Sequence, residues 1–444
     1  MFKKYVILTG LLFTAISFSQ SRFNLPRKDS DKIRFQLIDN LIIVPVEVNG
    51  IKLSFLLDSG VSKPILFNIT NTDSLQINNV ETIYLRGLGG GEPIEALKSK
   101  RNFFKIGNAL NVNQDIYVVF DNAINFTPRL GVPVHGIIGY DVFKDFIVDI
   151  NYTSKYLKLY KPDKYVYKDC KKCETFNLTF FNNKPYIDGE VKIESKLIPI
   201  KLLIDSGSGD ALWLFEDDEL GIIPHEDKYF VDFLGKGLSG SVYGKRSKVN
   251  SLKLKSFELK DVNAAFPDSI AISYARKHKK RNGSLSGEIL KRFNMIVDYG
   301  NAKLTLRKNR NFKSSFYYNK SGIVLEQNGV RIVKEEQGYV ERSKEGASTG
   351  TTINVVTLYK YALKPAYTIV ELRKDSPAEK AGLLIGDIII VINGKEAHMS
   401  SLQEINQMFR AENGKNIRIK VDRNGVITNH QFRLEDVFKQ KELP

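Results

Sequence analysis

The sequence contains a long internal repeat, and each copy places an Asp-Ser-Gly tripeptide after a predicted β-hairpin. The first copy reads LIIVPVEVNGIKLSFLLDSG at residues 41–60, and the second reads YIDGEVKIESKLIPIKLLIDSG at residues 186–207. In both copies, alternating apolar residues flank a short turn, Asn-Gly or Glu-Ser, which is typical of two antiparallel strands. Each hairpin therefore brings one aspartate, Asp58 or Asp205, to the end of a strand.

The two copies stay in step beyond the aspartates. A glycine-rich segment begins 28 residues after Asp58 (residues 86–91) and 31 residues after Asp205 (residues 236–241). A second glycine motif, GIIG in one copy and GSLSG in the other, ends 81 and 82 residues after the respective aspartate. Order, composition and spacing repeated over roughly 120 residues predict a duplicated all-β lobe.

These paired frames resemble the two-lobed aspartic peptidases of the pepsin and retropepsin group. The resemblance covers residues 33–308, with lobes at 33–163 and 174–308, and it depends on the pair because a single Asp-Ser-Gly is a common turn. It implies a mainly β fold of two duplicated lobes with short helices. It also implies that Asp58 and Asp205 hydrolyse protein or peptide bonds through an activated water, without a metal or an organic cofactor.

The chemistry of such a pair explains why two copies are needed. One carboxylate acts as general base on a water, while a second, protonated carboxyl acts as acid on the carbonyl oxygen. Two adjacent carboxyls cannot both ionise easily, so they share a proton and titrate together. The residues expected to support the pair are Ser59, Gly60, Ser206, Gly207 and Ser208.

Within that set, the resemblance implies that the two serines tie the lobes together through hydroxyl-to-backbone bonds. The glycines permit the close backbone approach that lets N–H groups face the carboxylates. Val61 follows the glycine in the first copy, whereas Ser208 follows it in the second. Because a hydroxyl bond favours the charged form of a carboxyl group, we expect Asp205 to hold the charge and Asp58 the proton.

The glycine-rich segments are candidates for flaps that close over a substrate, since flexible hairpin tips can exclude water and bond a peptide backbone. In the resembling family a flap tyrosine packs over the cleft, and Tyr84 lies near the first tip at a different offset. Ordinary strand packing of Tyr84 is the alternative. The flap candidates are Tyr84, Gly87, Gly89 and Gly90 in the first copy and Gly237 and Gly240 in the second.

The last third of the chain, residues 313–437, is predicted to be a separate unit. Residues 367–397 combine a strand, a helix begun by Ser-Pro-Ala, a glycine at the helix end and a strand closed by Asn-Gly. This order resembles a PDZ domain of the bacterial envelope-protease type, with an α+β fold. Residues 334–360 are expected to form an inserted loop or hairpin extension.

A PDZ domain accepts an extended chain terminus along a sheet edge beside a helix, so a carboxyl-terminal peptide is a possible ligand. A PDZ domain that only docks on the lobes and binds nothing is the alternative. The residues expected to line the groove are Gly322, Ile323, Leu325, Leu402 and Ile405.

The N-terminus predicts export. Lys3 and Lys4 precede an apolar run from Tyr5 to Phe18, which indicates a signal peptide at residues 1–19 and a periplasmic or extracellular protein. The run is shorter than the about 20 apolar residues of a membrane-spanning helix, the alternative interpretation. We expect no integral membrane span in the mature chain.

Composition limits the remaining classes. Cys170 and Cys173 cannot form a disulfide framework, and in an exported protein they are candidates for a local disulfide in the connection between lobes. The five histidines show no metal-ligand spacing, so no metal is expected. The formal charge of +16 predicts a solvated basic surface, including the run Lys277–Arg281. Without a recognition helix, zinc finger or aromatic RNA platform, no nucleic-acid partner is expected.

Together these features predict an aspartic endopeptidase with a PDZ domain for substrate or partner recognition. The alternative is a non-catalytic peptide-binding envelope protein that uses the lobe cleft and the PDZ groove as two recognition surfaces.

Overall fold

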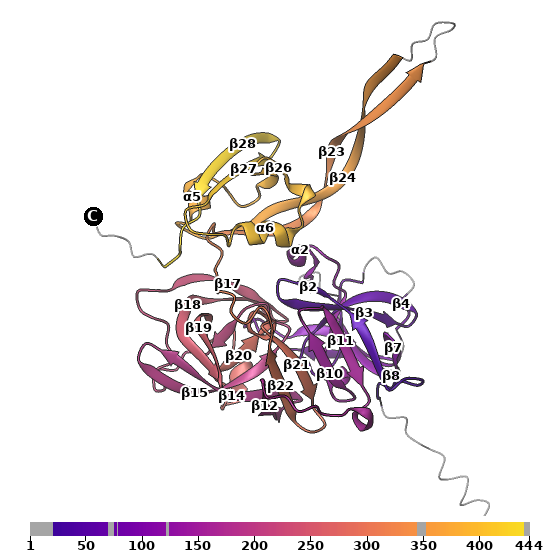
Figure 1. Cartoon of the computed structure of the whole chain (residues 1–444), viewed down its shortest axis with the longest axis vertical. Helices are drawn as coiled ribbons and strands as arrows, with labels where there is room; N and C mark the ends of the chain where they lie inside the picture. The colour runs from indigo at the N-terminus through magenta and orange to yellow at the C-terminus, as the bar shows by residue number, and fades with distance from the viewer. Residues whose placement is uncertain (1–20, 70–74, 78, 121–123, 344–351, 439–444) are drawn as a thin grey trace, which may run out of the picture. The chain divides into compact units, whose positions relative to one another are not determined.

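The computed structural model describes residues 21–69, 75–77, 79–120, 124–343 and 352–438. The chain forms two compact units, one from Met1–Asn125 and Pro133–Tyr317, the other from Phe126–Val132 and Tyr318–Pro444 (Figure 1). The predicted signal peptide lies outside the described residues. Among the residues that are described, no helix has the length and apolar character needed to cross a membrane.

The first lobe is built on an eight-stranded sheet. Its strands, in spatial order, are β2 (Gln36–Ile38), β3 (Leu41–Val48), β4 (Ile51–Leu57), β9 (Gly136–Ile138), β5 (Ile65–Leu66), β8 (Ala109–Val118), β7 (Ile94–Ile106) and β6 (Val80–Leu85). The short helix α3 (Tyr140–Phe143) follows β9. Along β3, every second residue from Ile42 to Val48 is buried, so the alternating pattern in the sequence sets one face against the core.

The second lobe repeats this sheet strand for strand. Its spatial order is β13 (Thr179–Phe181), β14 (Lys184–Ile193), β15 (Lys196–Asp205), β20 (Gly283–Ser286), β16 (Leu212–Leu214), β19 (Phe257–Pro267), β18 (Gly240–Leu254) and β17 (Phe230–Gly237). The helix α4 (Gly287–Leu290) follows β20, and the 3-10 helix η3 (Ala275–Lys277) precedes it. The duplicated, mainly β fold expected from the repeat is confirmed.

A third sheet joins the two lobes. Its order is β1 (Ser30–Arg34), β11 (Tyr156–Tyr160), β10 (Ile147–Asn151), β21 (Phe293–Asp298), β22 (Lys303–Lys308) and β12 (Cys173–Asn177). At its centre Val148 pairs with Val297, while Ile147 pairs with Asp298 and Asp149 with Ile296. The pairing is reciprocal, because Ile147 is equivalent to Ile296 and Asp149 is equivalent to Asp298. A local twofold axis therefore passes through the valine pair.

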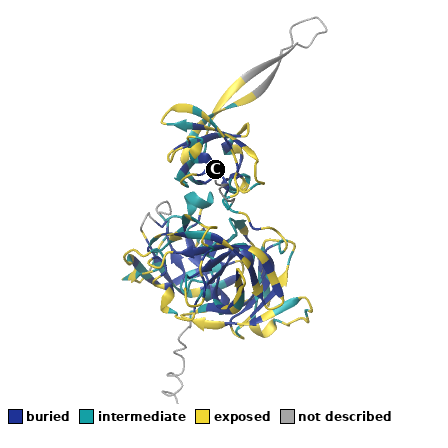
Figure 2. Ribbon diagram, turned by 90° about the vertical axis from the view of Figure 1, so that its left-hand side faces the viewer, coloured by how far each residue is buried: buried dark blue, intermediate teal, exposed yellow. Residues whose placement is uncertain are grey.

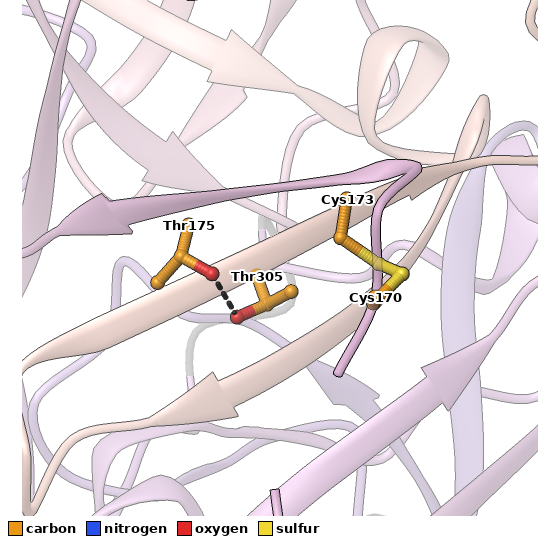
Figure 3. The surroundings of a disulfide bond; sticks show 4 residues. All are labelled: Cys170, Cys173, Thr175 and Thr305. Carbon is orange, nitrogen blue, oxygen red and sulfur yellow. Dashed lines mark hydrogen bonds between the residues drawn. A yellow bond between two sulfur atoms is a disulfide. The ribbon is translucent and has the colours of Figure 1, made fainter. Parts of the chain in front are cut away.

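A disulfide between Cys170 and Cys173 forms in the connection between the lobes, after the 3-10 helix η2 (Pro162–Lys164) (Figure 3). Strand β12 starts at Cys173, and the hydroxyls of Thr175 and Thr305 are 2.9 Å apart across β12 and β22. The bridge therefore lies where the chain enters the shared sheet.

The second unit has a five-stranded sheet with a short added strand. The order is β23 (Ile323–Ser343), β24 (Thr352–Leu372), β25 (Ile388–Ile392), β27 (Asn416–Arg423) and β28 (Val426–Arg433), with β26 (Lys395–Glu396) beside β25. Its helices are α2 (Thr127–Leu130), α5 (Pro377–Lys380), α6 (Leu402–Met408) and the 3-10 helix η4 (Ala397–Met399). Figure 2 shows buried residues inside each unit and exposed loops around them.

Two sequence signals set the helix starts in this unit. Ser376 caps α5, and Ser401 with Glu404 forms a capping box at α6, so backbone N–H groups without helical partners are satisfied. The segment 334–360, expected to be a loop or hairpin extension, is a hairpin where the structure describes it. Strands β23 and β24 continue their ladder and project from the sheet as a two-stranded ribbon (Figure 1).

Candidate active site

The two Asp-Ser-Gly turns meet at the contact between the lobes. The Ser59 N–H donates to Ser206 Oγ at 3.0 Å, and the Ser206 N–H donates to Ser59 Oγ at 3.1 Å. Each hydroxyl in turn donates to a carbonyl of the opposite lobe, Ile204 O at 2.6 Å and Leu57 O at 2.8 Å. The serines lie as the resemblance implies, and this reciprocal pattern puts both turns on the local twofold axis.

This arrangement sets Asp58 and Asp205 side by side. Asp58 follows β4 and Asp205 ends β15, the equivalent strand of the other lobe. The Gly60 N–H donates to Asp58 Oδ1 at 2.6 Å. A Cβ on Gly60 would lie 3.1 Å from Asp58 Oδ1 and 3.6 Å from Asp205 Oδ1, and one on Gly207 would lie 2.2 Å from Asp58 Cγ. Only glycine lets the backbone approach both carboxyls so closely.

Burial and mutual repulsion perturb the two carboxyls. Burial, followed by the charge of Asp205, raises the pKa of Asp58 from 3.8 to about 7, against the Gly60 N–H, the charge of Lys184 and the Gly207 N–H. Burial also raises the pKa of Asp205. Two cations, Arg281 and Lys184, and the N–H groups of Gly207 and Ser208 oppose that rise. Lys184 thus acts on both aspartates, whereas Arg281 acts on Asp205, so the two carboxyls have unequal surroundings. Ser208 contributes through its backbone N–H.

Sequence reasoning missed both cations. Arg281 ends the basic run Lys277–Arg281, which we expected to be solvated, yet its side chain is only 9% exposed. It donates to Gly283 O at 3.1 Å and to Ser284 Oγ at 2.6 Å, and its guanidinium lies 5.0 Å from the ring of Phe215. The expectation of a solvated run is therefore wrong for this residue, because the run leads directly into the buried strand β20.

The shared sheet lies on one side of the serine pair. A mostly apolar cavity lies between the shared sheet and the serine pair, and its lining includes Ser59, Ser206, Val297 and Tyr299. The Tyr299 ring stacks on Phe143, with ring centroids 5.2 Å apart. Burial raises the pKa of Tyr299 well above its usual value, and the negative charge of Asp58 adds to this effect.

The two glycine-rich tips touch each other. The Ser239 N–H donates to Leu88 O and the Gly91 N–H donates to Ser239 O, both at 2.9 Å, and the Gly87 N–H donates to Ser239 Oγ at 3.1 Å. Equivalent segments related by a twofold axis meet only at that axis, so the tips lie on the same axis as the serine pair. Sequence reasoning named the tips but did not predict that they bond to each other.

Close packing explains the glycines at these tips. A Cβ on Gly89 would lie 2.5 Å from the backbone of Gly240, and one on Gly237 would lie 2.3 Å from Leu88 O. Gly89 also has a φ of 120°, which other residues rarely adopt. Gly90 lies at the same tip with a φ of 72°. Tyr84 is 70% exposed on β6, where it pairs with Glu95 of β7, and its role at a flap stays a prediction.

The predicted PDZ groove residues lie mainly in the core of their unit. Ile323, Leu325, Leu402 and Ile405 belong to its buried apolar cluster, and Gly322 has a φ of 85° in the loop before β23. Their proposed contact with a ligand stays a prediction.

The loop before β23 has an acceptor of its own. Asn319 Oδ1 accepts from the N–H groups of Ser321 at 3.0 Å and Gly322 at 3.2 Å. Helix α2 belongs to the same unit as this loop, and its Arg129 pairs with Glu326 and Glu371, each at 2.8 Å.

Within the ranges that the structure describes, no group of three His, Cys, Asp or Glu residues is arranged to hold a metal ion.

Comparisons with known families agree with this geometry. An aspartyl protease family model matches residues 44–142, which include Asp58 and the glycine motif before α3. A PDZ domain family model matches residues 368–423. No curated protein sequence matches the chain. The second lobe, outside the first match, is related to it by the repeated sheet order and by the serine contacts. The chain therefore combines an aspartyl protease domain with a C-terminal PDZ domain.

Proposed function

We propose that this chain is an aspartic endopeptidase whose catalytic pair is Asp58 and Asp205. The observation that carries the proposal is the reciprocal bonding of Ser59 and Ser206, which holds the two carboxyls side by side on the axis between the lobes. The raised pKa of Asp58 supports a protonated partner near neutral pH. Such a pair supplies one acid and one base in the same site.

In the proposed reaction, ionised Asp205 takes a proton from a water, and protonated Asp58 gives its proton to the carbonyl oxygen of the substrate. The water oxygen bonds to the carbonyl carbon and forms a tetrahedral diol. Breakdown of the diol cleaves the C–N bond and transfers a proton to the leaving amine. The aspartates return to one shared proton, so no oxidant, metal or covalent enzyme intermediate enters the balance.

The tips around Gly89 and Gly240 act as flaps in this proposal. Their mutual bonds describe a closed arrangement that must open for a polypeptide to enter. Flap backbone groups then bond the extended substrate in place of each other. The PDZ domain recognises a substrate or partner peptide, and the chain is exported to the periplasm or the extracellular space. The Cys170–Cys173 disulfide supports the assignment to an oxidising compartment.

The test is cleavage of a diverse peptide pool by the full chain between pH 4 and 8, read by mass spectrometry, alongside Asp58→Asn and Asp205→Asn. Cleavage by the wild type that both variants lose supports the proposal and reports the sequence preference around the cut bond. Binding of a statine-type transition-state mimic gives a second readout. A folded wild type that binds peptides but cleaves none, and that prefers plain peptides to the mimic, supports a non-catalytic peptide-binding protein instead.

A further inference from the structure

The PDZ domain has an edge strand beside a helix. Strand β23 is the first strand of its sheet, and among the described strands it pairs with β24 alone. Ile323 and Leu325 of β23 share one apolar cluster with Leu402 and Ile405 of α6, so α6 packs on the inner face of the sheet next to that edge. An edge strand in this setting is where a PDZ domain adds an extended peptide as a further strand.

The loop before β23 marks one end of this groove. The Lys320 N–H of the loop donates to Phe409 O, just after α6 ends, at 2.9 Å. The N–H groups that a terminal carboxylate would use there already have acceptors, because Asn319 Oδ1 takes two of them and Ser321 Oγ accepts from the Ile323 N–H at 3.0 Å. A charged carboxylate is a stronger acceptor than a neutral amide or hydroxyl oxygen, so a peptide terminus can displace these side chains.

Helix α2 crosses the edge of β23 at the other end of the groove. Its Arg129 pairs at 2.8 Å with Glu326, which follows the core residue Leu325 and so lies on the outer face of the sheet. A Cβ on Gly131 would lie 3.1 Å from the Leu402 Cβ, at the start of α6 on the inner side. A segment that contacts both sides of the edge strand must pass over that edge.

These contacts leave room for only a short peptide. The same Gly131 Cβ position lies 3.6 Å from Gln327 Oε1, so α2 lies beside residues 326 and 327 of β23. A peptide with its carboxylate at the loop would run antiparallel to β23 from Ile323 toward this point. It would meet α2 after about four residues.

We propose that α2 is the internal ligand of the PDZ groove, so that a longer carboxyl-terminal peptide binds this chain only by displacing it. This role rests on the peptide recognition proposed above, which it makes conditional. The segment that the groove holds, Phe126–Val132, lies within the part of the chain that matches the aspartyl protease family. Because the chain leaves the first unit at Asn125 and rejoins it at Pro133, displacement by a peptide would alter a loop of the protease domain.

The first assay asks whether α2 is docked in solution. The amides of Leu130 and Gly131 are bonded within α2, at 3.0 and 2.9 Å, but a helix of four residues does not hold such bonds by itself in water. Slow hydrogen exchange at these amides in the full chain therefore reports docking. Arg129→Ala removes both charge pairs of α2 and should speed this exchange by about tenfold or more.

Arg410→Ala is the matched control, because Arg410 is an exposed arginine of the same unit just beyond α6. It should leave the exchange of α2 unchanged. If Arg129→Ala does not fold, Arg129→Lys keeps the charge without the fork of donors and should give a smaller change in the same direction. Exchange of α2 in the wild type as fast as in a free peptide would overturn the proposal.

The second assay asks whether α2 and a peptide compete. The immobilised full chain, in an Asp205→Asn background, is exposed to random octapeptides with free carboxyl termini and to the same pool ending in carboxamides. A cleft between the lobes would accept internal peptide segments of either pool, so the difference between the pools reports the PDZ groove. Arg129→Ala should retain at least about threefold more of the free-carboxyl pool than the background chain or Arg410→Ala.

Equal retention by all three forms, or an equal gain for both pools, would overturn the proposal. Neither assay depends on cleavage. If the chain cleaves no peptide but Arg129→Ala raises retention, the proposed endopeptidase fails and the internal ligand stands. If the chain cleaves peptides while α2 exchanges freely, the endopeptidase stands and the internal ligand fails.

Discussion

Replacing Asp58 with asparagine should stabilise the first unit relative to wild type, by an amount that grows as the pH rises. The folded pKa of Asp58, about 7, lies above its ordinary value of 3.8, so the folded protein holds this proton more tightly than the unfolded chain. For a raised pKa, the stabilising contribution is complete below about pH 4 and is lost as pH rises through about 7. The asparagine of the variant has a similar shape and no proton to lose, so this loss should disappear.

The magnitude follows from the size of the pKa change. Each pKa unit corresponds to about 1.4 kcal/mol. The rise in the pKa of Asp58 from 3.8 to about 7 therefore lowers the free energy of unfolding by about 4 kcal/mol between pH 4 and 8. Asp58 keeps partial contact with solvent, so the observed difference should be at or below this value. The free energy of unfolding of Asp58→Asn, relative to wild type, should rise by about 2 to 4 kcal/mol over that range.

The assay is urea unfolding of the full chain at several pH values, followed by tryptophan fluorescence. Trp213 is the single tryptophan of the sequence and is buried in β16, so its signal reports the first unit alone. Asp163→Asn is the control, because that side chain is 70% exposed and pairs only with neighbouring Lys164 in the described structure. If the wild type and Asp58→Asn lose stability in parallel as pH rises, the carboxyl pair is not the buried, mutually repelling pair that the geometry indicates.

Three further perturbations test other contacts. Ser59→Ala removes a buried hydroxyl that bonds the opposite lobe twice, so it should lower the free energy of unfolding of the first unit by about 2 to 3 kcal/mol, measured by urea unfolding; an unchanged value would contradict the lobe contact. Gly89→Ala forces a Cβ into the opposite tip, so amide hydrogen exchange there should become faster, and unchanged protection would mean that the tips are not bonded in solution. Arg423→Ala leaves the buried carboxylate of Asp387 without its bidentate partner and should destabilise the second unit by about 3 kcal/mol in hydrogen exchange, whereas a neutral effect would show that this carboxylate finds other partners.

The duplicated lobes and their aspartates could be predicted because their signals are local and repeated. The alternation of apolar residues specifies each hairpin, and the copy of a hairpin in the same frame specifies the second lobe. Export and the predicted groove of the PDZ domain remain predictions, since the first lies outside the described residues and the second depends on a ligand.

What could not be predicted depends on long-range register. Lys184 precedes Asp205 by 21 residues, and only the pairing of β14 with β15 shows that the two lie opposite each other. Arg281 stands in a basic run that looks solvated by composition, and its burial follows from the strand that begins two residues later. Aligning the two copies residue by residue against the expected ladders would have exposed both cations. In that alignment Lys184 corresponds to Leu41 of the first lobe, and Arg281 corresponds to Val134.

The reciprocal pairing of β10 with β21 has an evolutionary consequence. Each lobe contributes one half of the shared sheet, and the two halves pair through β10 and β21 as the subunits of a symmetric homodimer do, so the chain has the architecture of a dimer whose two subunits became one polypeptide. In a homodimer every substitution appears twice. Once the copies were joined, one half could acquire Arg281 while the other kept Val134, and an unequal pair of aspartates became accessible to selection.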